Sequence, residues 1–208
     1  MKTFNDAIDA YQSGDVAGAI GIWSALAENG DIRSQYNLGV LYDAGDAVQK
    51  NPWEAAMWFR KASEGGFADA QFNLAIMLLN GQGVSQDDVE AAHWFEAAAK
   101  QNHLEAAFNL AKSYAEGSGV DKDLVKAFNW YKTGASLKHA ASANNLAICY
   151  AMGNGTDRDD VEAYVWFNIA VELGDSVAVR HRERVANELT PEQIIQAGRT
   201  AQEWLANS

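Results

Sequence analysis

Residues 69–95 read DAQFNLAIMLLNGQGVSQDDVEAAHWF, and this stretch predicts two helices joined by a glycine-rich loop. In its first part, small and apolar residues recur at helical spacing, as Leu74 and Leu78 do. Gly81 and Gly83 then mark the end of the first helix, because glycine readily adopts the positive φ that a helix C-terminus commonly needs. The stretch therefore predicts a helical hairpin rather than a strand or an extended linker.

The second helix of this stretch is predicted to begin at Asp87. Asp and Asn are preferred N-cap residues because their side chains accept hydrogen bonds from unpaired backbone N–H groups. Glu90 follows three residues later and completes the capping-box pattern. Caps of the same type recur every 36 residues, at Asp15, Asn51, Asp123 and Asp159. A calcium loop around Asp159 is the alternative, but the terminal bidentate glutamate of an EF-hand is missing, so helix capping is the preferred interpretation.

The whole pattern repeats with a period of 36 residues. Each copy carries an Asn-Leu pair, a loop glycine, an alanine and a tryptophan followed by an aromatic ring. The Asn-Leu pairs begin at Asn37, Asn73, Asn109 and Asn145, and the loop glycines are Gly45, Gly81, Gly117 and Gly153. The alanines are Ala55, Ala91, Ala127 and Ala163, and the tryptophans are Trp58, Trp94, Trp130 and Trp166. A fixed period of this length is typical of repeat architectures. The sequence predicts an all-α fold with about twelve helices, an α/α solenoid in which helix-turn-helix repeats form a right-handed superhelix. The tryptophan stripe is expected to be core.

The repeats divide the chain into one repeat domain, 1–208, with modified ends. The predicted units are an N-terminal tetratricopeptide-like unit at 3–30, repeats at 31–66, 67–102, 103–138 and 139–174, and a C-terminal helical cap at 175–208. Terminal repeats of a solenoid deviate from the pattern because one face has no neighbour. The cap is expected to begin with a capping box at Thr190 and Gln193. Its apolar residues are expected to cover the core of the final repeat: Ile194, Ile195, Ala201, Trp204 and Leu205.

Charge and composition exclude several classes of function. The 208 residues carry a formal net charge of -12, whereas proteins that bind nucleic acids or anionic membranes need an excess of cations. A neutral or basic partner is more compatible with this charge than an acidic one. Cys149 is the only cysteine, so no intrachain disulfide is expected, and it is interpreted as a small buried side chain.

The chain also shows no targeting segment. Residues 1–15 have no apolar run of the kind that a signal peptide contains, and no run approaches the length of a membrane span. The sequence as written therefore predicts a cytoplasmic protein without membrane insertion. A periplasmic or secreted protein remains the alternative if a signal peptide has been removed.

Residues 69–74, 81–84 and 91–95 resemble the Sel-1-like repeat family, which is related to the tetratricopeptide repeats. The resemblance covers roughly residues 15 to 174. It implies a helical solenoid that acts as a scaffold or regulatory adaptor, with no cofactor and no catalysis. One branch of the family has a cysteine pair in each repeat and is associated with binding or hydrolysing β-lactams, which is the alternative function. This chain lacks those pairs and has no serine with a lysine three residues later.

In the tetratricopeptide relatives, the first helix of each pair lines a concave groove. Transferring that orientation places partner-binding residues at helical spacing on one face: Arg33, Tyr36, Asn37, Phe72, Asn73, Ile76, Phe108, Asn109, Lys112, Asn144 and Asn145, with Val40 on the same face. An asparagine amide offers both a donor and an acceptor to the backbone of an extended peptide. The alternative is that each asparagine bonds to the adjacent helix and fixes the repeat geometry. His103 and His139 share a register but form a poor metal site without a carboxylate-rich third ligand.

Overall fold

The computed structural model describes residues 2–45 and 47–207, and these residues form twelve α-helices and no strand. The predicted all-α fold is therefore confirmed. The helices are α1 (Phe4–Gln12), α2 (Val16–Glu28), α3 (Ile32–Ala44), α4 (Pro52–Glu64), α5 (Ala68–Asn80), α6 (Asp88–Ala99), α7 (Leu104–Glu116), α8 (Leu124–Ser136), α9 (Ala140–Met152), α10 (Asp160–Glu172), α11 (Ala178–Ala186) and α12 (Pro191–Asn207).

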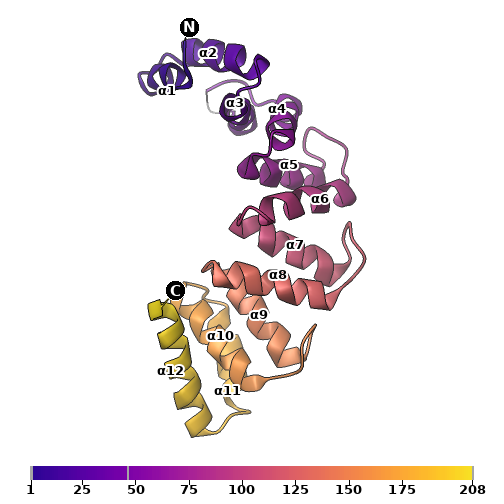
Figure 1. Ribbon diagram of the computed structural model, residues 1–208, viewed down its shortest axis with the longest axis vertical. Helices are drawn as coiled ribbons and strands as arrows, with labels where there is room; N and C mark the ends of the chain where they lie inside the picture. The colour runs from indigo at the N-terminus through magenta and orange to yellow at the C-terminus, as the bar shows by residue number, and fades with distance from the viewer. Residues whose placement is uncertain (1, 46, 208) are drawn as a thin grey trace. The chain divides into compact units, whose positions relative to one another are not determined.

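The chain forms two compact units, Met1–His103 with α1 to α6 and Leu104–Ser208 with α7 to α12. Within each unit, consecutive helices pack against one another as pairs, such as α3 with α4 and α9 with α10 (Figure 1). The first helices of the four repeats start 36 residues apart, and so do their second helices. Each unit has its own buried apolar core.

Glycines end the first helices in the way that the sequence predicts. Gly45, Gly81 and Gly153 have φ values of 75°, 64° and 70°, which lie in the left-handed region. The N–H of each glycine donates to the carbonyl four residues earlier, as Gly81 does to Met77. The conformation satisfies a terminal carbonyl and turns the chain into the loop.

The predicted N-caps also form. The carboxylates of Asp87 and Asp123 each accept a hydrogen bond of 2.9 Å from the backbone N–H three residues later. Asp15, Asn51 and Asp159 cap α2, α4 and α10 in the same manner. Because these bonds span only three residues, the local sequence is sufficient to specify them.

The second half of the predicted capping box does not form at Glu90. The backbone N–H of Asp87, which Glu90 would bind, donates instead to the Leu78 carbonyl at 3.1 Å. The Glu90 carboxylate accepts from Arg60 on α4 and from the Trp94 indole N–H at 3.1 Å. The hydrogen bond from Arg60 is the main reason why the pKa of Glu90 is lowered. Glu90 therefore links α4 to α6 instead of completing a cap.

We expect Asp87→Ala and Asp123→Ala each to lower the free energy of unfolding by about 0.5–2 kcal/mol, because a helix N–H loses its acceptor. Urea denaturation of the full chain measures the loss. Asp157→Ala, in the exposed loop before α10, serves as the control and should change stability by less than about 0.5 kcal/mol. A rise in melting temperature with calcium would contradict the capping interpretation.

The aromatic residue after each repeat tryptophan is the deeper of the two. Trp58 is buried, but Trp94, Trp130 and Trp166 are only half-buried, so the core interpretation is right for one tryptophan of four. The fully packed rings are Phe59, Phe95, Tyr131 and Phe167. The cause is helical geometry, because adjacent residues point about 100° apart and only one of them can face the first helix of the pair.

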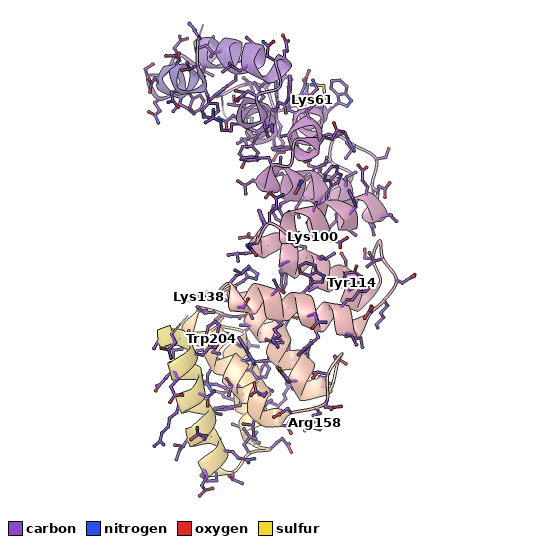
Figure 2. All side chains as sticks on the ribbon, in the orientation of Figure 1. Lys61, Lys100, Tyr114, Lys138, Arg158 and Trp204 are labelled. Carbon is purple, nitrogen blue, oxygen red and sulfur yellow. The ribbon has the colours of Figure 1, made fainter. Side chains whose placement is uncertain are left out.

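The half-buried tryptophans still make defined contacts. Trp166 meets Trp204 edge to face, with ring centroids 5.3 Å apart. Trp204 lies near the end of α12 (Figure 2). α12 packs on α10, and it begins with the predicted capping box between Thr190 and Gln193. The expectation for Ile195 is wrong, since this side chain is exposed on the outer face of α12.

Candidate partner-binding surface

The predicted partner-binding residues all lie on the first helices of the repeats, α3, α5, α7 and α9. Of the four asparagines that define the register, each is half-buried, whereas Arg33 and Lys112 are exposed. Asn37 and Asn73 belong to the N-terminal unit, and Asn109 and Asn145 belong to the C-terminal unit. The structure thus presents two asparagine pairs, one on each unit.

The aromatic neighbours of the asparagines are used mainly for packing between repeats. The Tyr36 ring lies 4.8 Å from that of Phe67, measured between centroids, at the start of the next first helix. The Phe72 ring stacks on His103 at 4.7 Å, and Phe108 meets His139 edge to face at 5.4 Å. These rings stabilise repeat junctions, so they offer a partner less surface than the sequence suggested.

Asn73 joins two repeats of the N-terminal unit. Its side chain lies close to the hydroxyl of Tyr36 on α3. The pKa of Tyr36 is raised, chiefly by burial and further by the Asp69 carboxylate, while the nearby Asn73 amide opposes the rise. For this asparagine, the bracing interpretation agrees with the contacts.

Asn145 and Asn109 bond differently. The Asn145 Nδ2–H donates to the Ala141 carbonyl at 2.9 Å, and Asn109 donates to the Glu105 carbonyl at 2.7 Å, so each binds its own helix. The residue that precedes Asn145 by 37 positions, as Tyr36 precedes Asn73, is Phe108, which has no hydroxyl. Because Nδ2 of each asparagine donates a hydrogen bond to its own helix, the side-chain Oδ1 is the acceptor that these asparagines can present to a partner.

Asn144 is unsuited to the predicted contact role. It is buried, and its Oδ1 lies 3.0 Å from Nδ1 of His181 on α11. The His181 ring in turn lies 5.5 Å from the Phe167 ring. Asn144 therefore fastens α11 to the last repeat, and it is buried, whereas the other predicted partner-binding residues are half-buried or exposed.

The histidines and the cysteine are structural groups in this fold. His139 caps α9 by accepting from the Ser142 N–H at 3.3 Å, and burial lowers its pKa. Burial likewise raises the pKa of the Cys149 thiol to about 11, so little reactive thiolate forms at neutral pH. In the described ranges, no group of three or more His, Cys, Asp or Glu side chains could hold a metal ion.

A cavity that the sequence interpretation missed lies in the N-terminal unit. It has a volume of about 300 Å³ and is lined by Ile8, Tyr11, Trp23, Asn37, Val40, Leu41, Ala44 and Ala47. Two of these residues, Asn37 and Val40, were placed on the binding face by their spacing. One feature of the sequence could have pointed to this cavity. Trp23 lies 36 residues before Phe59, so it occupies the same repeat position as that core ring.

The repeat pattern also identifies the family. The family model of the Sel1 repeat matches residues 32–67, 68–103, 104–139 and 140–175, which are consecutive and make up more than half of the chain. The chain belongs to the Sel1 repeat family. Sel1 repeat proteins are helical solenoids that commonly act as protein-interaction scaffolds and are typically non-catalytic. No protein with a curated description matches the chain.

Solved structures of bacterial Sel1 repeat proteins are similar to this Sel1 repeat chain. One is c5321, a protective antigen present in uropathogenic Escherichia coli strains, with 30% identity and a TM-score of 0.84 over 98% of this chain and 44% of that one. This chain thus spans less than half the length of c5321. Another is a Sel1 repeat protein from Oxalobacter formigenes, with 32% identity and a TM-score of 0.79 over 85% of this chain and 72% of that one.

A third similar structure is the cysteine rich protein B of Helicobacter pylori, at 22% identity and a TM-score of 0.50, over 65% of this chain and 97% of that one. This likeness supports the fold alone. In the part of this chain that the structure describes, no helix has both the length and the apolar character needed to cross a membrane.

Proposed function

We propose that this Sel1 repeat protein is a non-enzymatic scaffold or regulatory adaptor that binds a peptide or protein segment along its first helices. The observation that carries the proposal is the bonding of Asn109 and Asn145. Each amide group is oriented by a hydrogen bond to its own helix at a half-buried position, which presents a fixed side-chain oxygen. A fixed acceptor suits the backbone N–H groups of an extended peptide, since little side-chain entropy is lost on binding.

The surface proposed for the partner consists of polar and aliphatic side chains on the first helices. In the N-terminal unit these are Arg33, Asn37, Val40, Asn73 and Ile76, and in the C-terminal unit Asn109, Lys112 and Asn145. The half-buried rings of Tyr36, Phe72 and Phe108 support this surface from below rather than forming it.

Charge favours a neutral or basic partner. Residues 1–103 contain fourteen acidic and six basic side chains, and residues 104–208 contain fourteen and ten. Both halves therefore repel phosphate backbones, which supports a protein partner rather than a nucleic acid. Electrostatic attraction would also raise the rate at which a basic segment associates.

Selection from a phage-displayed library of random twelve-residue peptides on the full chain supplies probes for the test. We expect Asn109→Ala and Asn145→Ala each to weaken binding of a selected peptide by about 1–3 kcal/mol, because a buried peptide N–H loses its acceptor. Calorimetry measures the affinity, and thermal melting of the same variants measures stability, which should change much less.

Asn129→Ala is the matched control, since Asn129 is exposed on the second helix α8. Asn73→Ala should differ from these three variants, because it removes an amide that lies beside Tyr36 at a repeat junction, and it is expected to lower the melting temperature. Unchanged affinity in both Asn109→Ala and Asn145→Ala would remove the asparagines from the binding surface. Failure to select any peptide would count against the scaffold function itself.

A further inference from the structure

The cavity near Trp23 is built by three helices of the N-terminal unit. α1 contributes Ile8 and Tyr11, α2 contributes Trp23, and most of the remaining lining comes from α3. Apolar side chains dominate it, and its volume of about 300 Å³ suits one side chain of a partner rather than a cofactor. Tyr11 and Val40, which line the cavity, are each 40% exposed.

The indole N–H of Trp23 is the feature that packing does not explain. Trp23 is only 3% exposed, and its Nε1 has no hydrogen-bond acceptor in the described ranges. Buried indole groups usually find an acceptor, because an unpaired buried donor loses its hydrogen bond to water. The equivalent positions in later repeats include Phe59, Phe95 and Phe167, which fill the core without an N–H. Packing at this repeat position therefore needs only a phenylalanine ring. The indole of Trp23 adds a hydrogen-bond donor that packing does not require.

A second cavity, in the C-terminal unit, shows which features are general. It lies 144 residues further along the register, with Phe167 in place of Trp23, Met152 in place of Ile8 and Arg184 in place of Val40. Its volume is about 170 Å³, and the Phe167 ring that takes the place of Trp23 has no N–H. A hollow at this register thus occurs in both units, whereas the larger space and the unpaired Trp23 donor are found in the N-terminal unit.

We propose that the Trp23 cavity is an anchor site for one aliphatic or aromatic side chain of a peptide partner, whose backbone carbonyl accepts a hydrogen bond from the Trp23 indole. The inference rests on the proposed scaffold function and specifies one contact of it. Because the indole N–H is covered, the proposed contact requires a neighbouring side chain to turn aside, and the half-exposed Tyr11 ring, whose centroid lies 5.6 Å from that of Trp23, is the nearest aromatic candidate. The acidic excess of this unit favours Lys or Arg on either side of the anchor residue.

The test uses the full chain and peptides selected from the phage-displayed library, with the indole resonances observed by ¹H–¹⁵N NMR. The chain has seven tryptophans, and Trp23→Phe identifies the resonance of Trp23. We expect peptide binding to move this indole proton downfield while most of the other indole signals stay in place. Trp23→Phe, which the register indicates will fold, should weaken binding about threefold to tenfold through loss of one hydrogen bond.

Val40→Arg is designed to fill the cavity with the residue type found at the equivalent position, Arg184. It should weaken peptide binding at least about tenfold. Met152→Arg is the matched control, since it places an arginine on the exposed rim of the other cavity and should leave affinity within about twofold.

The outcomes separate the anchor site from the scaffold function. If selected peptides bind but neither shift the Trp23 resonance nor respond to Val40→Arg, the anchor site is wrong while the scaffold function stands. If Val40→Arg instead abolishes a dimer seen by sedimentation without peptide, the cavity binds a second copy of the chain and the peptide proposal is overturned. If no peptide is selected at all, both proposals fail.

Discussion

Replacing Phe95 by alanine is expected to lower the free energy of unfolding by about 3–5 kcal/mol. The Phe95 side chain has no exposed surface, and its ring lies 6.0 Å from that of Phe72 on the facing first helix. Removing the ring takes away apolar contacts on all sides and leaves a cavity that rigidly packed helices can fill only in part. Guanidinium denaturation, followed by circular dichroism and by tryptophan fluorescence, measures the loss.

The neighbouring tryptophan provides the matched comparison. Trp94→Ala removes a larger ring, but this ring is half-buried and is bonded through Nε1 to Glu90, so we expect a smaller loss of about 1–2 kcal/mol. Coincident transitions by the two probes are needed before either number is extracted, because repeat chains can unfold in parts. A loss for Trp94→Ala that equals or exceeds the loss for Phe95→Ala would contradict the assignment of the deep core position.

The features that the sequence predicts well are those that depend on a few neighbouring residues. The caps at Asp87 and Asp123 involve bonds across three residues, and the helix ends at Gly81 and Gly153 depend on the conformation of a single residue. The 36-residue period repeats these local signals in four copies. Fold class, helix order and helix ends therefore follow from the sequence.

The features that the sequence does not predict depend on competition between distant partners. At Asp87, the backbone N–H donates to Leu78, so Glu90 is available to bind Arg60 from a neighbouring repeat. A capping-box pattern gives no information about that competitor. The choice between Trp94 and Phe95 for the core likewise depends on the rotation of α6 about its own axis, which the shared register leaves open.

In the candidate site, too, some features follow from the sequence and others depend on distant partners. The register correctly placed the asparagines together with Val40 on the first helices, but identical residues make different bonds. Asn73 lies beside the Tyr36 hydroxyl, whereas Asn145, whose equivalent neighbour is Phe108, donates to the Ala141 carbonyl of its own helix. The cavity beside Trp23 was missed because it needs residues of three helices, and the 36-residue pattern alone does not show how these helices pack together.

Replacing Gly83 by alanine is expected to lower the free energy of unfolding by about 2–4 kcal/mol, which combines left-handed strain with overpacking. Gly83 has a φ of 71°, and a Cβ there would overlap the Pro52 carbonyl and lie 2.6 Å from the Trp53 nitrogen. These are backbone atoms at the start of α4, so they cannot turn away as a flexible side chain would. The substitution forces the loop off the helix of the preceding repeat.

Comparison with Gly81→Ala shows how much of the stability loss in Gly83→Ala comes from overpacking. Its φ of 64° imposes a similar left-handed strain, but a Cβ there would approach no atom closer than 3.7 Å. We therefore expect Gly81→Ala to lower the free energy of unfolding by only about 1–2 kcal/mol, measured by urea denaturation alongside Gly83→Ala. In the C-terminal unit, Gly155 lies against Leu124 while Gly153 is unobstructed, so this pair should reproduce the difference. Equal losses within both pairs would mean that the loops do not lie against the preceding second helices, and the close approach that the second glycine permits would no longer explain how successive repeats are joined.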